Sequence, residues 1–126
     1  MIRIMQTSAV VAALLWPVLA FGLTSEELYG ACLGVGSPGK EAQSIFCTAY
    51  VSGVIDGIDL EHQGSPRWCI PKGTTVQQVA AVVLTWLAAQ PQESRQKYPA
   101  EADVMSAIER AWPCTPAPAP PRNLKD

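Results

Sequence analysis

Hydrophobic and polar residues follow one another along most of this chain with the three-to-four-residue spacing of amphipathic helices. The clearest segment carries apolar side chains on one wide face: Phe46, Cys47, Tyr50, Val51, Val54, Ile55 and Ile58. Polar residues such as Ser52 and Asp56 fall on the other face. This periodicity predicts a core-facing helix, which we expect to begin at Pro38 behind an N-cap Ser37 and to end near Leu60.

Two glycines, Gly53 and Gly57, lie within this helix at a spacing of four, which puts them on one face. Each costs roughly 1 kcal/mol relative to alanine in a helix interior. A patch without side chains lets a neighbouring backbone come close, so we expect close packing within the molecule over both glycines. A binding role for the patch is the alternative.

Capping residues mark two further helices. Thr24 and Glu27 form a capping box, which predicts a short first helix from about Ser25 to Leu33, and glycines follow it. Thr75 with Gln78 repeats the pattern before an apolar run that ends at Ala89. The valines of that run mildly favour a strand. The caps and the length of the run favour a helix.

A last helix is expected to have Pro99 as its first residue and to end before Pro113. Its predicted buried side consists of Val104, Ile108, Ala111 and Trp112. Its predicted solvated side consists of Glu101, Asp103, Glu109 and Arg110. The polar segment 92–98 reads as a linker or as an irregular helical turn. The fold class predicted from these elements is all-α, a small bundle of four to five helices.

Both ends of the chain differ from this helical domain, which we place at residues 21–114. Arg3, an apolar stretch and the small-residue pattern that ends at Ala20 are typical of a secretory signal peptide, residues 1–20. A transmembrane anchor is the alternative, but the stretch is barely long enough to span a bilayer. Residues 115–126 are rich in proline and predict a disordered tail.

An exported small domain with an even number of cysteines is expected to form disulfides in an oxidising compartment. The four cysteines are Cys32, Cys47, Cys69 and Cys114. Three connectivities are possible. If successive helices form antiparallel hairpins, Cys32 comes close to Cys47 and Cys69 comes close to Cys114, so we predict these two intrachain bridges. The scattered spacing and the single histidine do not suit a zinc site.

Charge and motifs argue against several classes of function. The chain has 9 Lys+Arg and 11 Asp+Glu, and loss of Arg3 with the signal peptide makes the balance more acidic. No basic field is therefore available for nucleic acid. His62 lies in a loop without a nucleophile elbow, and Asp56 and Asp59 read as a solvated helix face. No metal or cofactor motif is present. We therefore expect no enzyme, no catalytic residue, no metal and no cofactor.

The order of several short motifs resembles the Rap/Tai family of type VI secretion immunity proteins over nearly all of residues 24 to 114. The motifs are the stretch from Cys47 to Gly57, then Trp68-Cys69-Ile70-Pro71, Trp86-Leu87 and Ala111-Trp112-Pro113-Cys114. The resemblance implies a periplasmic protein that binds and inhibits a peptidoglycan amidase effector and so protects the cell that produces it. Several family members act as homodimers. The resemblance assigns no inhibitory residue.

A rigid scaffold with a projecting loop suits the occlusion of an enzyme cleft. Turn-forming residues dominate the predicted connection from Glu61 to Gly73, and Cys69 pins its far end. We therefore expect the partner-binding residues near its polar tip: Asp59, Glu61, His62, Gln63 and Arg67. The segment from Gln90 to Tyr98 is a second candidate for the contact.

A periplasmic acid-stress chaperone like HdeA is the alternative function, because such chaperones are also small, helical and disulfide-containing. That role requires apolar surface to become exposed when carboxylates are protonated. The two functions make different demands: a dedicated inhibitor binds one enzyme near neutral pH, whereas a chaperone binds many unfolded clients in acid.

Overall fold

Five α-helices form the part of the chain that the computed structural model describes, residues 22–114. They are α1 (Ser25–Cys32), α2 (Glu41–Glu61), α3 (Val76–Ala89), α4 (Gln92–Lys97) and α5 (Ala100–Ala111). The all-α prediction is confirmed. The predicted signal peptide, 1–20, and the predicted tail, 115–126, lie outside the described residues. Within 22–114, no helix combines the length and the apolar character needed to cross a membrane.

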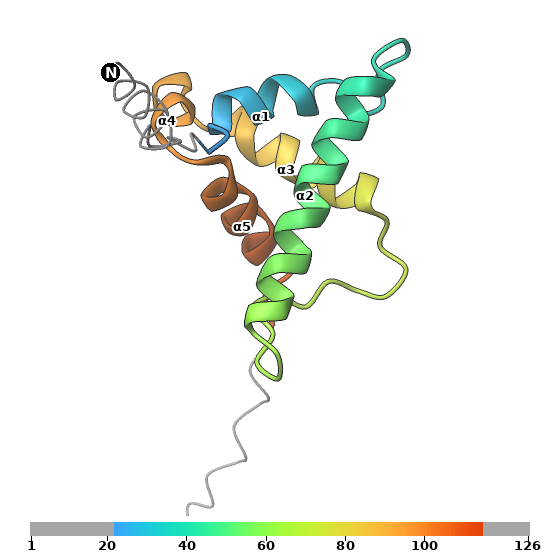
Figure 1. Cartoon of the computed structure of the whole chain (residues 1–126), viewed down its shortest axis with the longest axis vertical. Coiled ribbons are helices and arrows are strands. Elements are labelled where there is room, and N and C mark those ends of the chain that lie inside the picture. Colours follow the sequence, from blue (N-terminus) through green and yellow to red (C-terminus); the bar gives the residue numbers. More distant parts are fainter. Residues whose placement is uncertain (1–21, 115–126) are drawn as a thin grey trace, which may run out of the picture.

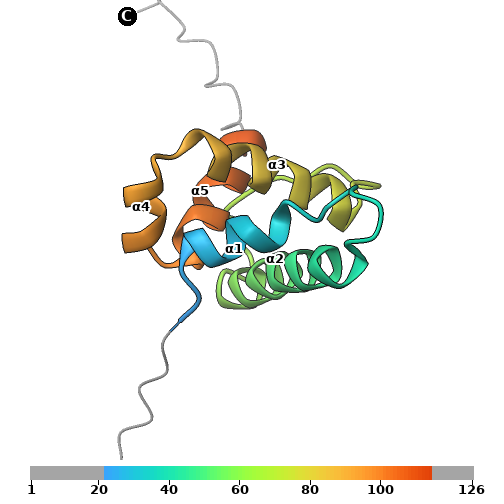
Figure 2. The same ribbon diagram turned by 90° about the horizontal axis from the view of Figure 1, so that it is seen from above.

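The shortest of the apolar helices, α1, lies at the centre of the bundle. It contacts each of the other four helices, and Figure 2 shows it between α2 on one side and α3 and α5 on the other. Leu28 and Cys32 are completely buried. Since eight residues are too few for a helix that is stable alone, α1 owes its stability to these tertiary contacts and to its capping box.

The core is completed by one face of α3 and one face of α5. The buried side chains of these two helices are Val79, Ala80, Val83 and Leu87 in α3, and Ala100, Val104, Ala107 and Ile108 in α5. Trp68, in the connection between α2 and α3, is also buried. Ala111 is exposed, contrary to prediction, because α5 ends there, and Trp112 is half-buried.

The long helix α2 begins three residues later than predicted. Ser37 does not cap it, because its hydroxyl donates to the carbonyl oxygen of Leu33 at 3.0 Å and so closes the end of α1. Gly39 has φ +77°, a left-handed conformation that no α-helix can contain. The helix therefore starts only after this turn, at Glu41.

The segment between α3 and α5 forms the short helix α4, which is the second of the two alternatives predicted for it. The residues after α4 pair with the start of α1: Ser25 N donates to Tyr98 O at 3.0 Å, and Ala100 N donates to Leu23 O at 2.8 Å. Pro99 is the N-cap of α5 and not its first residue. These bonds fix the α4 end of the bundle.

Both predicted disulfides are present. Cys32 and Cys47 join α1 to α2, and Cys69 and Cys114 join the α2–α3 connection to the segment after α5. The Cys69 amide also donates to the Trp112 carbonyl oxygen at 2.9 Å. The far end of the connection is therefore held by a covalent bond and by a hydrogen bond.

Candidate protein-binding site

The connection between α2 and α3 is the longest one in the described part of the chain, and Figure 1 shows it running from the lower end of α2 back to α3. Trp68 anchors its middle, since this residue is 4% exposed and its indole Nε1 donates to Asp59 Oδ1 at 3.1 Å. Asp59, at the end of α2, therefore holds the middle of the loop in place through Trp68.

The tip of the loop is a tight turn directly after α2. The His62 amide donates to the Ile58 carbonyl oxygen at 2.9 Å, and the Ser65 amide donates to the His62 carbonyl oxygen at 3.0 Å. Gly64 has φ +85°, which glycine adopts without strain. The His62 ring Nδ1 lies 3.2 Å from the same Ile58 oxygen. The backbone conformation of the tip is therefore well defined.

Arg67 is less free than the sequence suggests. Its Nε forms an ion pair with Glu109 Oε1 on α5, and both side chains are about one-third exposed. The loop is thus held at two neighbouring points, by this ion pair to α5 and by the disulfide from Cys69 to the segment after α5. The part of the loop that projects is shorter than predicted and consists of the residues around His62, Gln63 and Gly64.

A hollow of about 330 Å³ lies between the end of α2 and the loop. It is lined by Asp59, His62, Gln63, Gly64, Pro66, Trp68, Cys69 and Ile70. The structure thus brings three of the five predicted partner-binding residues together in one place. Glu61 is exposed at the end of α2, where it lines a different groove along that helix, and has no hydrogen-bond partner among the described residues, while Arg67 is turned to α5.

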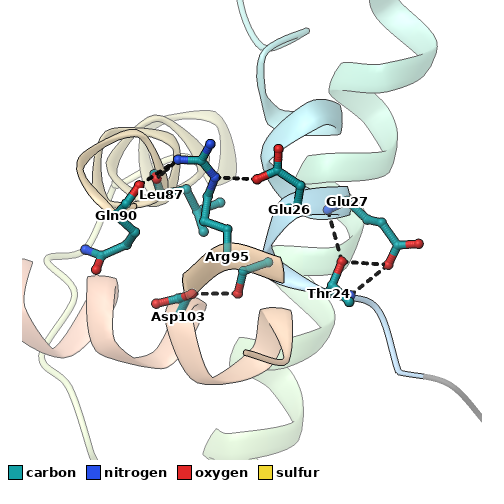
Figure 3. Close-up of polar contacts among 8 residues, drawn as sticks. Thr24, Glu26, Glu27, Leu87, Gln90, Arg95 and Asp103 are labelled. Atoms are coloured by element: carbon teal, nitrogen blue, oxygen red, sulfur yellow. Dashed lines mark hydrogen bonds and ion pairs between the residues drawn. The ribbon is translucent and has the colours of Figure 1, made fainter. Parts of the chain in front are cut away.

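The second predicted contact region, α4, is held by a buried arginine. Arg95 is 9% exposed, and its guanidinium donates to Glu26 Oε2 at 2.6 Å and to the carbonyl oxygens of Gln90 and Leu87 at 2.7 and 3.1 Å (Figure 3). It also lies 4.1 Å from the centre of the Tyr29 ring. Nothing in the hydrophobic pattern predicts this role, because the arginine occurs in a polar segment.

The outward side of α4 carries an exposed ion pair between Glu93 and Lys97, with 2.7 Å between the charged atoms. Pairs of this kind contribute little to stability. The loop after α2 lines a hollow with several of its residues, whereas the hollow between α3 and α5 reaches the second candidate segment only at Gln90, its first residue. The geometry therefore favours the loop over α4 as a contact region.

The prediction of close packing over Gly53 and Gly57 is wrong. A Cβ atom built at either position has no neighbour within 4 Å, so both face open space. The close approach occurs instead at Gly34, where a Cβ atom would lie 2.6 Å from Gln43 Cβ. A side chain is therefore excluded at Gly34, just after α1, whereas no contact within the molecule requires glycine at position 53 or 57.

A groove of about 550 Å³ runs along this part of α2. It is lined by Ala49, Tyr50, Gly53, Val54, Gly57, Ile58, Glu61 and Glu101. Partial burial, together with the neighbouring Glu101 carboxylate, raises the pKa of the Tyr50 phenol, so this side chain is neutral at physiological pH. A third hollow, of about 670 Å³, lies between α3 and α5 beside Trp86 and Arg110.

The described residues offer little for catalysis. All four cysteines are in disulfides, so residues 22–114 contain no free thiol. In the same range, no group of three or more His, Cys, Asp or Glu side chains could hold a metal ion. The chemistry that this surface offers is that of binding: hydrogen-bonding side chains, carboxylates and a rigid loop.

Comparison with known proteins gives one result. The sequence model of a family described as Rap1a immunity proteins matches residues 24–114, a range that contains all five helices and all four cysteines. No match to a curated protein is found.

Proposed function

Because the chain belongs to the Rap1a immunity protein family, we propose that it binds and inhibits a peptidoglycan amidase effector delivered by type VI secretion. In this proposal it acts in the periplasm, without catalysis and without a cofactor, and protects the wall of the cell that produces it. The observation that carries the proposal is the family match over residues 24–114. Two disulfides support the location, because they persist in oxidising compartments.

The rigidity of the loop supports inhibition by occlusion. Binding costs less conformational entropy when the contact segment is ordered before the partner arrives. Here the loop is fixed by the buried indole of Trp68, by the disulfide at Cys69 and by the ion pair of Arg67. We propose that its tip enters the cleft of the effector.

The charges near the tip define the kind of partner surface that fits. Asp59 lines the hollow and Glu61 is exposed at the end of α2, two residues along the chain, while the positive charge of Arg67 is paired with Glu109. The tip is therefore acidic, and it suits an effector with a basic rim around its cleft, since complementary charges speed association and orient it.

The experiment uses a secreted peptidoglycan amidase, which we expect the neighbouring reading frame to encode, and measures its cleavage of peptidoglycan at neutral pH in the presence of increasing amounts of this protein. We expect cleavage to stop near one equivalent. Undiminished cleavage at a large excess would overturn the proposed function.

Two matched variants then locate the contact. Replacing Glu61 and Gln63 by alanine removes two exposed side chains at the loop and should weaken inhibition about tenfold or more, because few residues carry most of the energy of an interface. The control replaces Gln92 and Glu93, the same two residue types on α4, and should leave inhibition unchanged. The reverse result would place the contact on α4, and no change in either variant would exclude both regions.

A further inference from the structure

The hollow between α3 and α5, which we call the α3–α5 groove, is larger than the two hollows that adjoin α2. Its volume of about 670 Å³ lies within the range of about 300 to 1,000 Å³ that is usual for sites of small organic molecules. Along α3 it extends from Ala81 to Ala89, a distance of about 12 Å at the rise of an α-helix. The proposed contact with the effector leaves this groove without a role.

Most of the side chains that line the groove are apolar, and most of these are small: Ala81, Val82, Trp86, Ala89, Ala107 and Ala111. Alanine and valine side chains carry no hydrogen-bonding group, so they favour the apolar part of a ligand. Trp86 supplies the one broad surface. It is half-buried, whereas Leu87, the other residue of the Trp-Leu motif, is completely buried. The leucine of this motif therefore serves the core, and the tryptophan forms a wall of the groove.

The position of the Trp86 ring is fixed from behind. Its indole Nε1 donates to Asp103 Oδ1 at 2.9 Å, and the other carboxylate oxygen of Asp103 accepts from the Ser25 hydroxyl at 2.5 Å. Ser25 is completely buried. A ligand would therefore meet a wall that is already in place, and binding to an ordered surface costs less conformational entropy.

Only one polar side chain of the groove is left to bind a ligand. The Thr85 hydroxyl donates to the Ala81 carbonyl oxygen at 3.0 Å, and the Gln90 amide nitrogen donates to the Trp86 carbonyl oxygen at 3.3 Å. Both are thus engaged with the backbone of α3. Arg110 is exposed and has no ion pair within residues 22–114. Its guanidinium carbon lies 6.0 Å from the centre of the Trp86 ring, so the positive charge stands beside the apolar wall.

We propose that the α3–α5 groove binds a small amphipathic carboxylate, a molecule with an acyl-like apolar body and one carboxylate group. The apolar body lies along α3 against Trp86. The carboxylate accepts hydrogen bonds from Arg110, because the planar guanidinium presents two parallel donors to two carboxylate oxygens. A cationic head group would be repelled by Arg110, and a neutral one would leave its charge without a partner.

The test uses the purified protein without any effector, so its outcome is independent of the proposed function. Octanoate is the probe, and octanol is the matched neutral compound. Heteronuclear NMR follows the indole N–H signals, and the signal of Trp86 is the one that disappears in Trp86→Phe. We expect octanoate to shift the Trp86 signal and to leave that of Trp68, which lines a different hollow, unchanged. Octanoate should bind about fivefold more tightly than octanol, or better, because only octanoate pairs with Arg110.

A matched pair of variants then tests the role of the charge. Arg110→Gln should reduce the affinity for octanoate to that for octanol and leave octanol binding unchanged. Lys97→Gln is the control, because it also removes an exposed positive charge from the last turn of a helix, but Lys97 does not line the groove. It should leave the binding of both compounds unchanged, and circular dichroism should show both variants folded.

Three results would overturn the proposal: no shift of the Trp86 signal with octanoate, equal affinity of the wild type for octanoate and octanol, or an octanoate affinity that Arg110→Gln does not change. A synthetic peptide of residues 115–121 serves as a competing occupant, because these residues are rich in proline and proline-rich segments bind aromatic-lined grooves. If this peptide shifts the Trp86 signal and octanoate does not, the groove belongs to that segment of the chain and the proposal is wrong.

Discussion

The guanidinium of Arg95 satisfies backbone groups that water cannot easily reach. The end of a helix leaves its last carbonyl groups without intrahelical partners. At the end of α3 the Gln90 carbonyl oxygen accepts from Arg95, and the Leu87 carbonyl oxygen accepts from Arg95 as well as from the Gln90 amide. Its charge is balanced by Glu26 on α1. One residue on α4 therefore joins α3 and α1.

Arg95→Met should destabilise the protein by about 2 to 4 kcal/mol, because it leaves the Gln90 carbonyl group and the Glu26 carboxylate without their partner and removes one of the two hydrogen bonds to the Leu87 carbonyl oxygen. The free energy of unfolding in urea, monitored by circular dichroism, measures this loss. Lys97→Met is the control on the same short helix. It breaks only an exposed pair with Glu93 and should change stability by less than about 0.5 kcal/mol. Equal effects of the two substitutions would contradict a special role for Arg95.

At the scale of the element, capping boxes start α1 and α3 in the same way but with different chemistry. In α1, Glu27 accepts from the Thr24 amide at 2.8 Å and from the Thr24 hydroxyl at 2.9 Å (Figure 3). In α3, the neutral amide of Gln78 takes the place of the carboxylate and accepts from the Thr75 amide at 2.8 Å. Only the first cap can depend on pH.

The backbone and hydroxyl hydrogen bonds from Thr24 lower the pKa of Glu27 below its usual value of 4.5. The folded state therefore favours the ionised carboxylate, and the cap's contribution is present above pH 4.5 and lost as the pH falls through the lower, folded pKa. Glu27→Gln should accordingly flatten the decrease of Tm in acid. Gln78→Ala should lower Tm by a similar amount at every pH. Parallel Tm curves for Glu27→Gln and the wild type would contradict this prediction.

Local signals in the sequence sufficed for the helices that begin with a capping box. The box at Thr24 and the box at Thr75 placed the starts of α1 and α3 correctly, because a cap involves residues only three apart. The start of α2 was missed because Ser37 and Pro38 are also suited to turns, and because left-handed Gly39 has no signature in the periodicity. Periodicity likewise included Phe46 in the core-facing stripe, since it cannot tell which of two apolar faces is buried.

The candidate site was predicted less completely, because its contacts join residues far apart in the chain. Cysteine count and hairpin geometry gave the anchor at Cys69. They could not show that Arg67 pairs with Glu109 on α5, or that Asp103, expected on a solvated face, accepts hydrogen bonds from Ser25 and Trp86. Such pairs depend on how the helices pack, which hydrophobic spacing alone does not specify.

At the scale of the whole molecule, the two disulfides have separate tasks. Cys32 and Cys47 are completely buried and belong to the core between α1 and α2. The other bridge lies near the surface, because Cys69 is exposed and Cys114 is half-buried, and it closes the longer loop, with a sequence separation of 45 against 15. It contributes by restricting the unfolded chain and by fixing the loop that we propose as the contact region.

Replacing Cys69 and Cys114 by alanine should therefore cost about 4 kcal/mol through the entropy of the unfolded chain, with little loss of packing. Replacing Cys32 and Cys47 should cost about 3 kcal/mol from the same cause, and more from the lost core contacts. The effect on inhibition should differ from the effect on stability, with the larger loss of inhibition in the variant that lacks Cys69 and Cys114. At a temperature where circular dichroism shows both to be folded, loss of the Cys69 bridge frees one end of the loop and should weaken inhibition of the amidase, whereas loss of the buried bridge leaves the loop attached. Equal inhibition by both variants would mean that the partner is bound elsewhere than at the anchored loop.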